Sequence, residues 1–77
     1  MTEAQAKFIA RAWGNSQDVA YCEKHSTPTS RACVRNGWLV PTAKGGKYPN
    51  GDEYVWHEVS WAGVVAMTAA LREITKT

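Results

Sequence analysis

Apolar residues recur at helical spacing in the first segment of the chain. Thr2 is suited to cap a helix, because its hydroxyl can accept a hydrogen bond from a backbone N–H of the first turn. Gly14 ends the periodic pattern. The pattern predicts a helix over residues 2–13, with one apolar face made by Ala4, Phe8, Ile9, Ala12 and Trp13.

A second, shorter helix is predicted directly afterwards. Asn15 and Ser16 are both cap-forming residue types. Asp18 would lie in the first turn, where a carboxylate interacts favourably with the positive end of the helix dipole. We therefore expect a helix over residues 17–24, ended by the polar residues that follow it.

The clearest helix boundaries belong to a third helix. Thr27 is a cap residue, and Pro28 would occupy the first helical position, where its missing N–H removes no intrahelical bond. Gly37 can adopt the left-handed conformation that ends many helices. These signals predict a helix over residues 28–36.

A β-hairpin follows. Residues 38–40 favour a strand, and we expect Pro41 to end its pairing because proline cannot donate to the ladder. Residues 44–52 contain two turn-rich stretches, and residues 53–59 form a second β-prone run. The prediction is a hairpin with a long basic tip. We expect its return strand to bury the face made by Val55, His57 and Val59.

The chain closes with another amphipathic segment. Ser60 can cap this helix, and Gly63 inside it suggests close packing against a neighbouring element, since glycine costs about 1 kcal/mol relative to alanine there. The apolar stripe is made by Val64, Met67, Leu71 and Ile74, widened by Trp61 and Val65.

Composition places the chain among folded domains. Of its 77 residues 44% are apolar and 21% charged, which predicts a single domain over residues 1–77. Four tryptophans supply much of the apolar side-chain surface available for burial, and we expect Trp13, Trp38 and Trp61 in the core. The longest uncharged run, residues 59–71, is too short for a membrane span of about 20 residues. With no signal-peptide pattern at its start, we expect the chain in the cytoplasm.

The charges are unevenly distributed. Residues 24–51 contain no acidic residue, whereas all seven acids lie in the flanking segments. Net charge is only +2, so position matters more than total charge. The acid-free segment carries five cations and coincides with the third helix and the hairpin: Lys24, Arg31, Arg35, Lys44 and Lys47.

The order of predicted elements resembles that of the winged helix-turn-helix family of small bacterial and phage regulators. The run from Val34 to Leu39 resembles a recognition helix entering an "rGWL" strand, and Val59 to Gly63 resembles the "LTxAG" start of the helix after the wing. The resemblance implies an α+β fold with three helices, a β-hairpin wing and a C-terminal helix. It also implies transcription regulation through double-stranded DNA. Pro28 and the long Gly-rich wing depart from the family pattern.

The residue types of the third helix suit that function. Arg31 and Arg35 are four residues apart and share one helix face, from which they can contact bases and phosphates. Lys44 and Lys47 at the wing are suited to phosphate contact. The complete set predicted to contact DNA is Thr27, Thr29, Ser30, Arg31, Arg35, Lys44 and Lys47.

A protein-interaction module of the same fold is the alternative. Tyr54 and Trp56 on the return strand would then provide exposed aromatic surface for a partner protein. Homodimerisation through the first and last helices would fit either function, because a monomer presents only one half-site.

Catalysis and cofactor binding are not expected. Cys22 and His25 have metal-ligand spacing, but Cys33 and His57 are isolated, so two buried thiols and two ordinary histidines are favoured over zinc. Neither a complete phosphate-binding loop nor a nucleophile elbow is present. The sequence predicts no enzyme, no metal and no cofactor.

Overall fold

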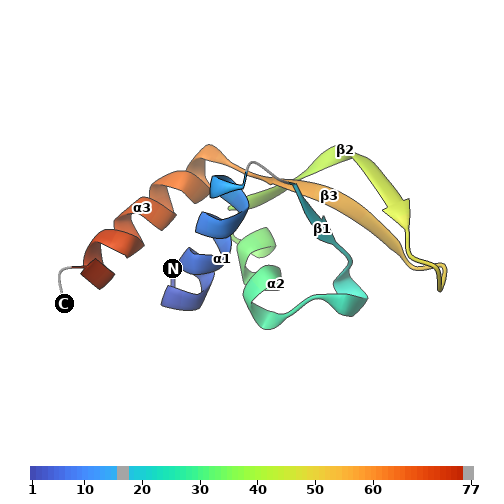
Figure 1. Cartoon of the computed structure of the whole chain (residues 1–77), viewed down its shortest axis with the longest axis horizontal. Helices are drawn as coiled ribbons and strands as arrows, with labels where there is room; N and C mark the ends of the chain where they lie inside the picture. The colour runs from blue at the N-terminus through green and yellow to red at the C-terminus, as the bar shows by residue number, and fades with distance from the viewer. Residues whose placement is uncertain (16–17, 76–77) are drawn as a thin grey trace.

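The computed structural model describes residues 1–15 and 18–75. Within these residues the fold is α+β, with three α-helices and a three-stranded antiparallel sheet of order β1-β3-β2. The molecule measures 45 × 21 × 20 Å, and the β2–β3 ribbon projects from the helical end (Figure 1). In chain order the elements are α1 (Glu3–Gly14), β1 (Val19–Tyr21), the 3-10 helix η1 (Glu23–His25), α2 (Pro28–Arg35), β2 (Leu39–Lys47), β3 (Glu53–Val59) and α3 (Trp61–Thr75).

Reciprocal caps begin the first two α-helices. In α1 the Thr2 hydroxyl accepts from the Gln5 backbone N–H at 3.1 Å, and the Gln5 side chain accepts from the Thr2 N–H at 2.9 Å. Thr27 and Ser30 make the equivalent pair at α2. Gly37 has φ of 75°, the left-handed conformation expected after α2. The helices predicted over residues 2–13 and 28–36 are confirmed.

The helix predicted over residues 17–24 is wrong. Residues 16 and 17 lie outside the described part of the chain, and the rest of the segment forms β1 and η1. Val19 pairs with His57 and Tyr21 with Val55, so β1 occupies one edge of β3. Ladder hydrogen bonds with β3 therefore outweigh the local helix signals of caps and first-turn charge.

Strand β2 continues past Pro41, contrary to the prediction that pairing ends there. Pro41 pairs with His57, and Lys47 still pairs with Glu53. An edge strand tolerates proline because one side of its backbone needs no partner, and β2 is an edge strand. The basic residues predicted at the hairpin tip consequently lie within β2.

The true tip is short. Gly51 N–H donates to the Tyr48 carbonyl at 2.9 Å, and Tyr48 N–H donates to the Asp52 carbonyl at 2.8 Å. Gly51 has φ of 94°. Proline, asparagine and a left-handed glycine in this order form a three-residue hairpin loop with a glycine bulge, which explains the Pro49-Asn50-Gly51 sequence.

The core joins the three α-helices to the base of the sheet. Ile9, Cys33, Leu39 and Met67 form its buried centre, one each from α1, α2, β2 and α3. On β3, His57 is 5% exposed and its Nδ1 lies 2.9 Å from the Val55 carbonyl oxygen.

The predicted inward face of β3 is only partly correct. His57 is buried and Val59 packs against the core, but Val55 is 39% exposed. Val55 pairs with Gly45 on the tip side of the β2 bulge and does not belong to the hydrophobic cluster around the core; the ribbon projects from the helical end (Figure 1).

Two tryptophans expected in the core lie on the surface. Trp61 is 76% exposed and Trp13 is 51% exposed, whereas Trp38 is half-buried against the core. The prediction that tryptophans form the core is therefore wrong for Trp13 and Trp61. Leu39 and Ile9 fill the centre instead.

Candidate nucleic-acid interface

The five cations of residues 24–51 divide into two groups. Lys24 Nζ lies 3.5 Å from Asp52 Oδ1, and Lys47 Nζ lies 3.8 Å from Glu53 Oε1. The other three have no acidic partner among the described residues, and all three are exposed: Arg31, Arg35 and Lys44. The second group is therefore available to an external anion.

Helix α2 turns its cationic face outward. Arg31 and Arg35 are one helical turn apart and exposed, while Ala32 and Cys33 between them are buried. Thr29 is half-buried. Because the opposite face of α2 is buried, the orientation of the helix is fixed and both arginine side chains project into solvent on the same side of the molecule.

Two of the predicted contact residues serve the helix cap. Ser30 is 7% exposed, and its hydroxyl lies within hydrogen-bond distance of the Thr27 N–H and carbonyl. The Thr27 hydroxyl accepts from the Ser30 N–H at 3.1 Å. Their hydroxyls hold the start of α2 in place, and Ser30 is not exposed to a bound duplex.

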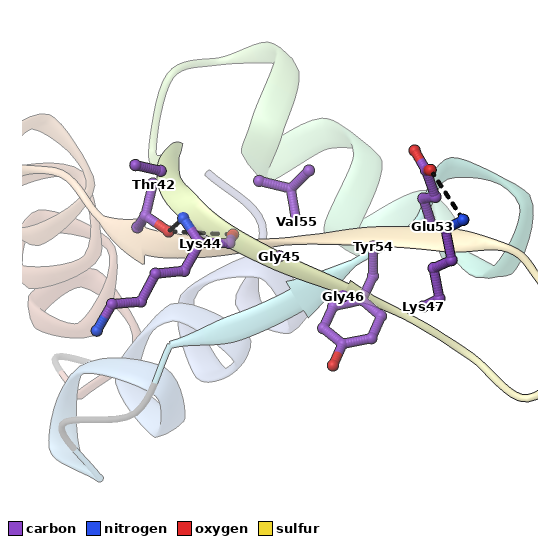
Figure 2. A pocket seen from close by; sticks show the side chains of 9 residues that line it. Thr42, Lys44, Gly45, Gly46, Lys47, Glu53, Tyr54 and Val55 are labelled. Atoms are coloured by element: carbon purple, nitrogen blue, oxygen red, sulfur yellow. Dashed lines mark hydrogen bonds and ion pairs between the residues drawn. The ribbon is translucent and has the colours of Figure 1, made fainter.

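A bulge in β2 positions Lys44. Pro41 pairs with His57 and Gly45 with Val55, so residues 42–44 face a single residue, Trp56. Thr42 Oγ1 accepts from the Lys44 backbone N–H at 3.2 Å and closes the bulge. Figure 2 shows the Lys44 side chain leaving on the side of the ribbon where the Tyr54 ring lies, opposite to Val55. Bulges commonly redirect a side chain in this way.

The bulge and the following glycines leave a shallow hollow of about 350 Å³ on the ribbon. A Cβ on Gly46 would lie 2.5 Å from the Tyr54 hydroxyl oxygen, so the ring lies directly against this backbone (Figure 2). Lys47 and Glu53 border the hollow towards the tip. A Cβ on Gly45 would lie 2.6 Å from the Tyr54 backbone carbonyl oxygen, so position 45 has no room for a side chain, whereas a side chain at position 46 would displace the Tyr54 ring.

Tyr54 and Trp56, the residues of the alternative protein interface, form part of an aromatic row. Tyr48 and Tyr54 have ring centroids 4.9 Å apart, and Tyr54 and Trp56 meet edge to face at 5.4 Å. Both Tyr54 and Trp56 are half-buried. Their packing stiffens the ribbon and leaves less aromatic surface for a partner than sequence analysis predicted.

A contact that sequence analysis missed joins the hairpin tip to η1. His25 Nε2 lies 2.7 Å from Asp52 Oδ2, and Asn50 Nδ2 donates to the same oxygen at 3.2 Å. Hydrogen bonding to His25 is the main cause that lowers the pKa of Asp52. The loop-forming Asn50-Gly51-Asp52 sequence signals the turn, but nothing in it points to a histidine 27 residues away.

The thiols and histidines form no metal site in the part of the chain that is described, where no cluster of three His, Cys, Asp or Glu side chains occurs. Cys22 and Cys33 are free and buried. Burial raises the pKa of the Cys33 thiol above its ordinary value.

No helix in the described ranges has the length and apolar character needed to cross a membrane.

Comparisons with protein-family models, with curated protein sequences and with solved structures found no match to this chain.

Proposed function

We propose that the protein binds double-stranded DNA as a small winged-helix regulator. The observation that carries this proposal concerns the acid-free segment, residues 24–51. Three of its exposed cations have no acidic partner among the described residues: Arg31 and Arg35 on α2 and Lys44 on β2. We also propose that the protein acts in the cytoplasm, as expected from the sequence.

The arrangement of elements supports the winged-helix assignment in a modified form. Here η1 and the cap residues before α2 take the place of the first helix of a helix-turn-helix. The projecting β2–β3 ribbon is the wing (Figure 1). β1 pairs with β3 and anchors the wing to the helical end of the molecule.

In the proposed complex α2 enters the major groove. Arg31 and Arg35 then reach guanine edges or phosphates, since guanidinium groups can bind both in bidentate fashion. Lys44 contacts the phosphate backbone beside the wing. Thr27 and Ser30 act indirectly, because their cap fixes the direction in which α2 starts.

A pair of double variants tests this surface. Replacing Arg31 and Arg35 by alanine is expected to weaken binding to duplex DNA by about 10- to 100-fold. The matched control replaces Lys7 and Arg11, two exposed cations of α1, and removes the same net charge. We expect the control to change affinity less than about threefold, since only non-local attraction is lost. Equal losses in the two variants, or none in the first, would contradict the assignment of α2.

A further inference from the structure

The outward face of α3 is apolar and exposed. Trp61 is 76% exposed and Val65, one turn further along, is 53% exposed. Ala62 and Ala69 are also exposed. On the opposite side of the helix Gly63 and Met67 are buried against the core. The helix carries no charged residue between Trp61 and Leu71, and Thr68 is the polar residue of its outer face within that stretch.

This pattern is typical of a helix covered on both sides. A helix on a protein surface normally has a polar outer face, and one that is apolar all round is buried. Exposed apolar patches on monomers usually mark an interaction site. Trp61 contributes most to this apolar surface, because a tryptophan side chain can bury on the order of 150 to 250 Å² in a contact.

The face is complementary to itself. Trp61, Val65, Thr68 and Arg72 follow one another at intervals of four, three and four residues, which places them along one stripe of the helix. From Trp61 to Arg72 the stripe extends about 16 Å. When two such stripes lie antiparallel, Trp61 of one copy faces Arg72 of the other, and Val65 of one copy faces Thr68 of the other.

We propose that α3 pairs antiparallel with α3 of a second copy of this chain. The two-fold axis passes between Val65 and Thr68, and each Trp61 ring packs against the Arg72 guanidinium of the other copy. Such a cation–π contact is favourable and occurs twice in the dimer. Because the ring and the cation lie at opposite ends of one stripe, a second copy in antiparallel orientation satisfies both ends at once.

The dimer is expected to be weak. A single helix pair buries less than the roughly 800 Å² per partner of a standard interface. We expect a dissociation constant of about 1 to 100 μM. The inference is independent of the proposed DNA surface, because neither Arg31, Arg35 nor Lys44 takes part in it.

Sedimentation equilibrium over about 1 to 500 μM protein tests the proposal. The wild-type chain should show a reversible monomer–dimer equilibrium. Val65→Glu and Trp61→Gln should each weaken it at least about 10-fold, since each removes apolar contact at the centre or end of the stripe. The matched control is Val55→Glu, the same change at an exposed valine on β3. It should leave dimerisation unchanged, and circular dichroism should show each variant folded.

The pairing register has its own test. Mixing Val65→Glu chains with Thr68→Lys chains should restore dimers, as heterodimers, because the new carboxylate and ammonium groups face each other only in the antiparallel arrangement. A wild-type monomer at every concentration would overturn the proposal. Undiminished dimerisation of both α3 variants, or no heterodimer in the mixture, would overturn it as well.

Discussion

The imidazole of His25 lies against the carboxylate of Asp52, with Nε2 and Oδ2 2.7 Å apart, and joins η1 to the loop between β2 and β3. His25 ends η1, two residues before the α2 cap residue Thr27, and Asp52 closes the loop between β2 and β3. Lys24 adds a second contact to the same carboxylate. The loop between β2 and β3 therefore has a fixed attachment close to the start of α2.

This contact gives the stability of the protein an acid-sensitive component. Hydrogen bonding to His25 holds the pKa of Asp52 below its ordinary value of 3.8. The folded state thus binds fewer protons at this group than the unfolded state. Its contribution is fully present above pH 3.8 and is lost as the pH falls through the lowered pKa.

Asp52→Asn should therefore lower the melting temperature at neutral pH, and the difference from wild type should shrink below about pH 4. Thermal unfolding followed by circular dichroism at stepped pH measures this. Glu53→Gln, which alters the exposed neighbouring pair with Lys47, serves as the control. A difference in melting temperature between wild type and Asp52→Asn that stays constant down to pH 2 would contradict this explanation.

Gly63 has no room for a side chain. A Cβ there would lie 2.6 Å from the Trp38 carbonyl oxygen and 3.1 Å from Val59 Cγ1. Gly63→Ala should destabilise the protein by about 1 to 3 kcal/mol in chemical denaturation, because α3 must move away from the start of β2. Gly14→Ala is the matched control, since nothing lies within 4 Å of its Cβ position. It should stabilise by about 0.5 to 1 kcal/mol.

Ser60 fixes the first turn of α3. Its hydroxyl donates to the Gly37 carbonyl at 2.6 Å and accepts from the Gly63 N–H at 3.1 Å. Ser60→Ala should cost about 1 to 2 kcal/mol of unfolding free energy, as loss of a helix cap does. Ser60→Thr keeps the hydroxyl and should cost less than half as much; equal losses would argue against the cap.

Cys33 should be unreactive in the native protein. The residue is 0% exposed and burial raises its thiol pKa, so both access and the thiolate fraction are reduced. With an aromatic disulfide reagent at mildly alkaline pH, Cys33 should react only at the rate of unfolding, measured in a Cys22→Ser background. Immediate stoichiometric labelling would contradict the burial of α2 against the core.

Local signals in the sequence were sufficient for much of the fold. Thr2, Thr27 with Pro28, and Ser60 begin the three α-helices as predicted, because caps act over three or four residues. The close approach at Gly63 was likewise foreseen from glycine within a helix.

Features that depend on distant partners could not be predicted in this way. Val19 to Tyr21 form a strand only because β3 offers an unpaired edge. Continued pairing at Pro41 depends on the position of β2 at the edge of the sheet. The set predicted to contact DNA included Lys47, and the acid-free segment also included Lys24; the acidic partners of both become evident only when the hairpin is folded.

Salt dependence of binding to random-sequence duplex DNA tests the central claim most directly. Fluorescence anisotropy at about 50 and 200 mM salt should show wild-type affinity falling at least about 10-fold, because three cations displace counterions from phosphates. The slope should decrease in the Arg31→Ala, Arg35→Ala double variant. Absence of binding by the folded wild-type protein at the lower salt concentration would contradict the account.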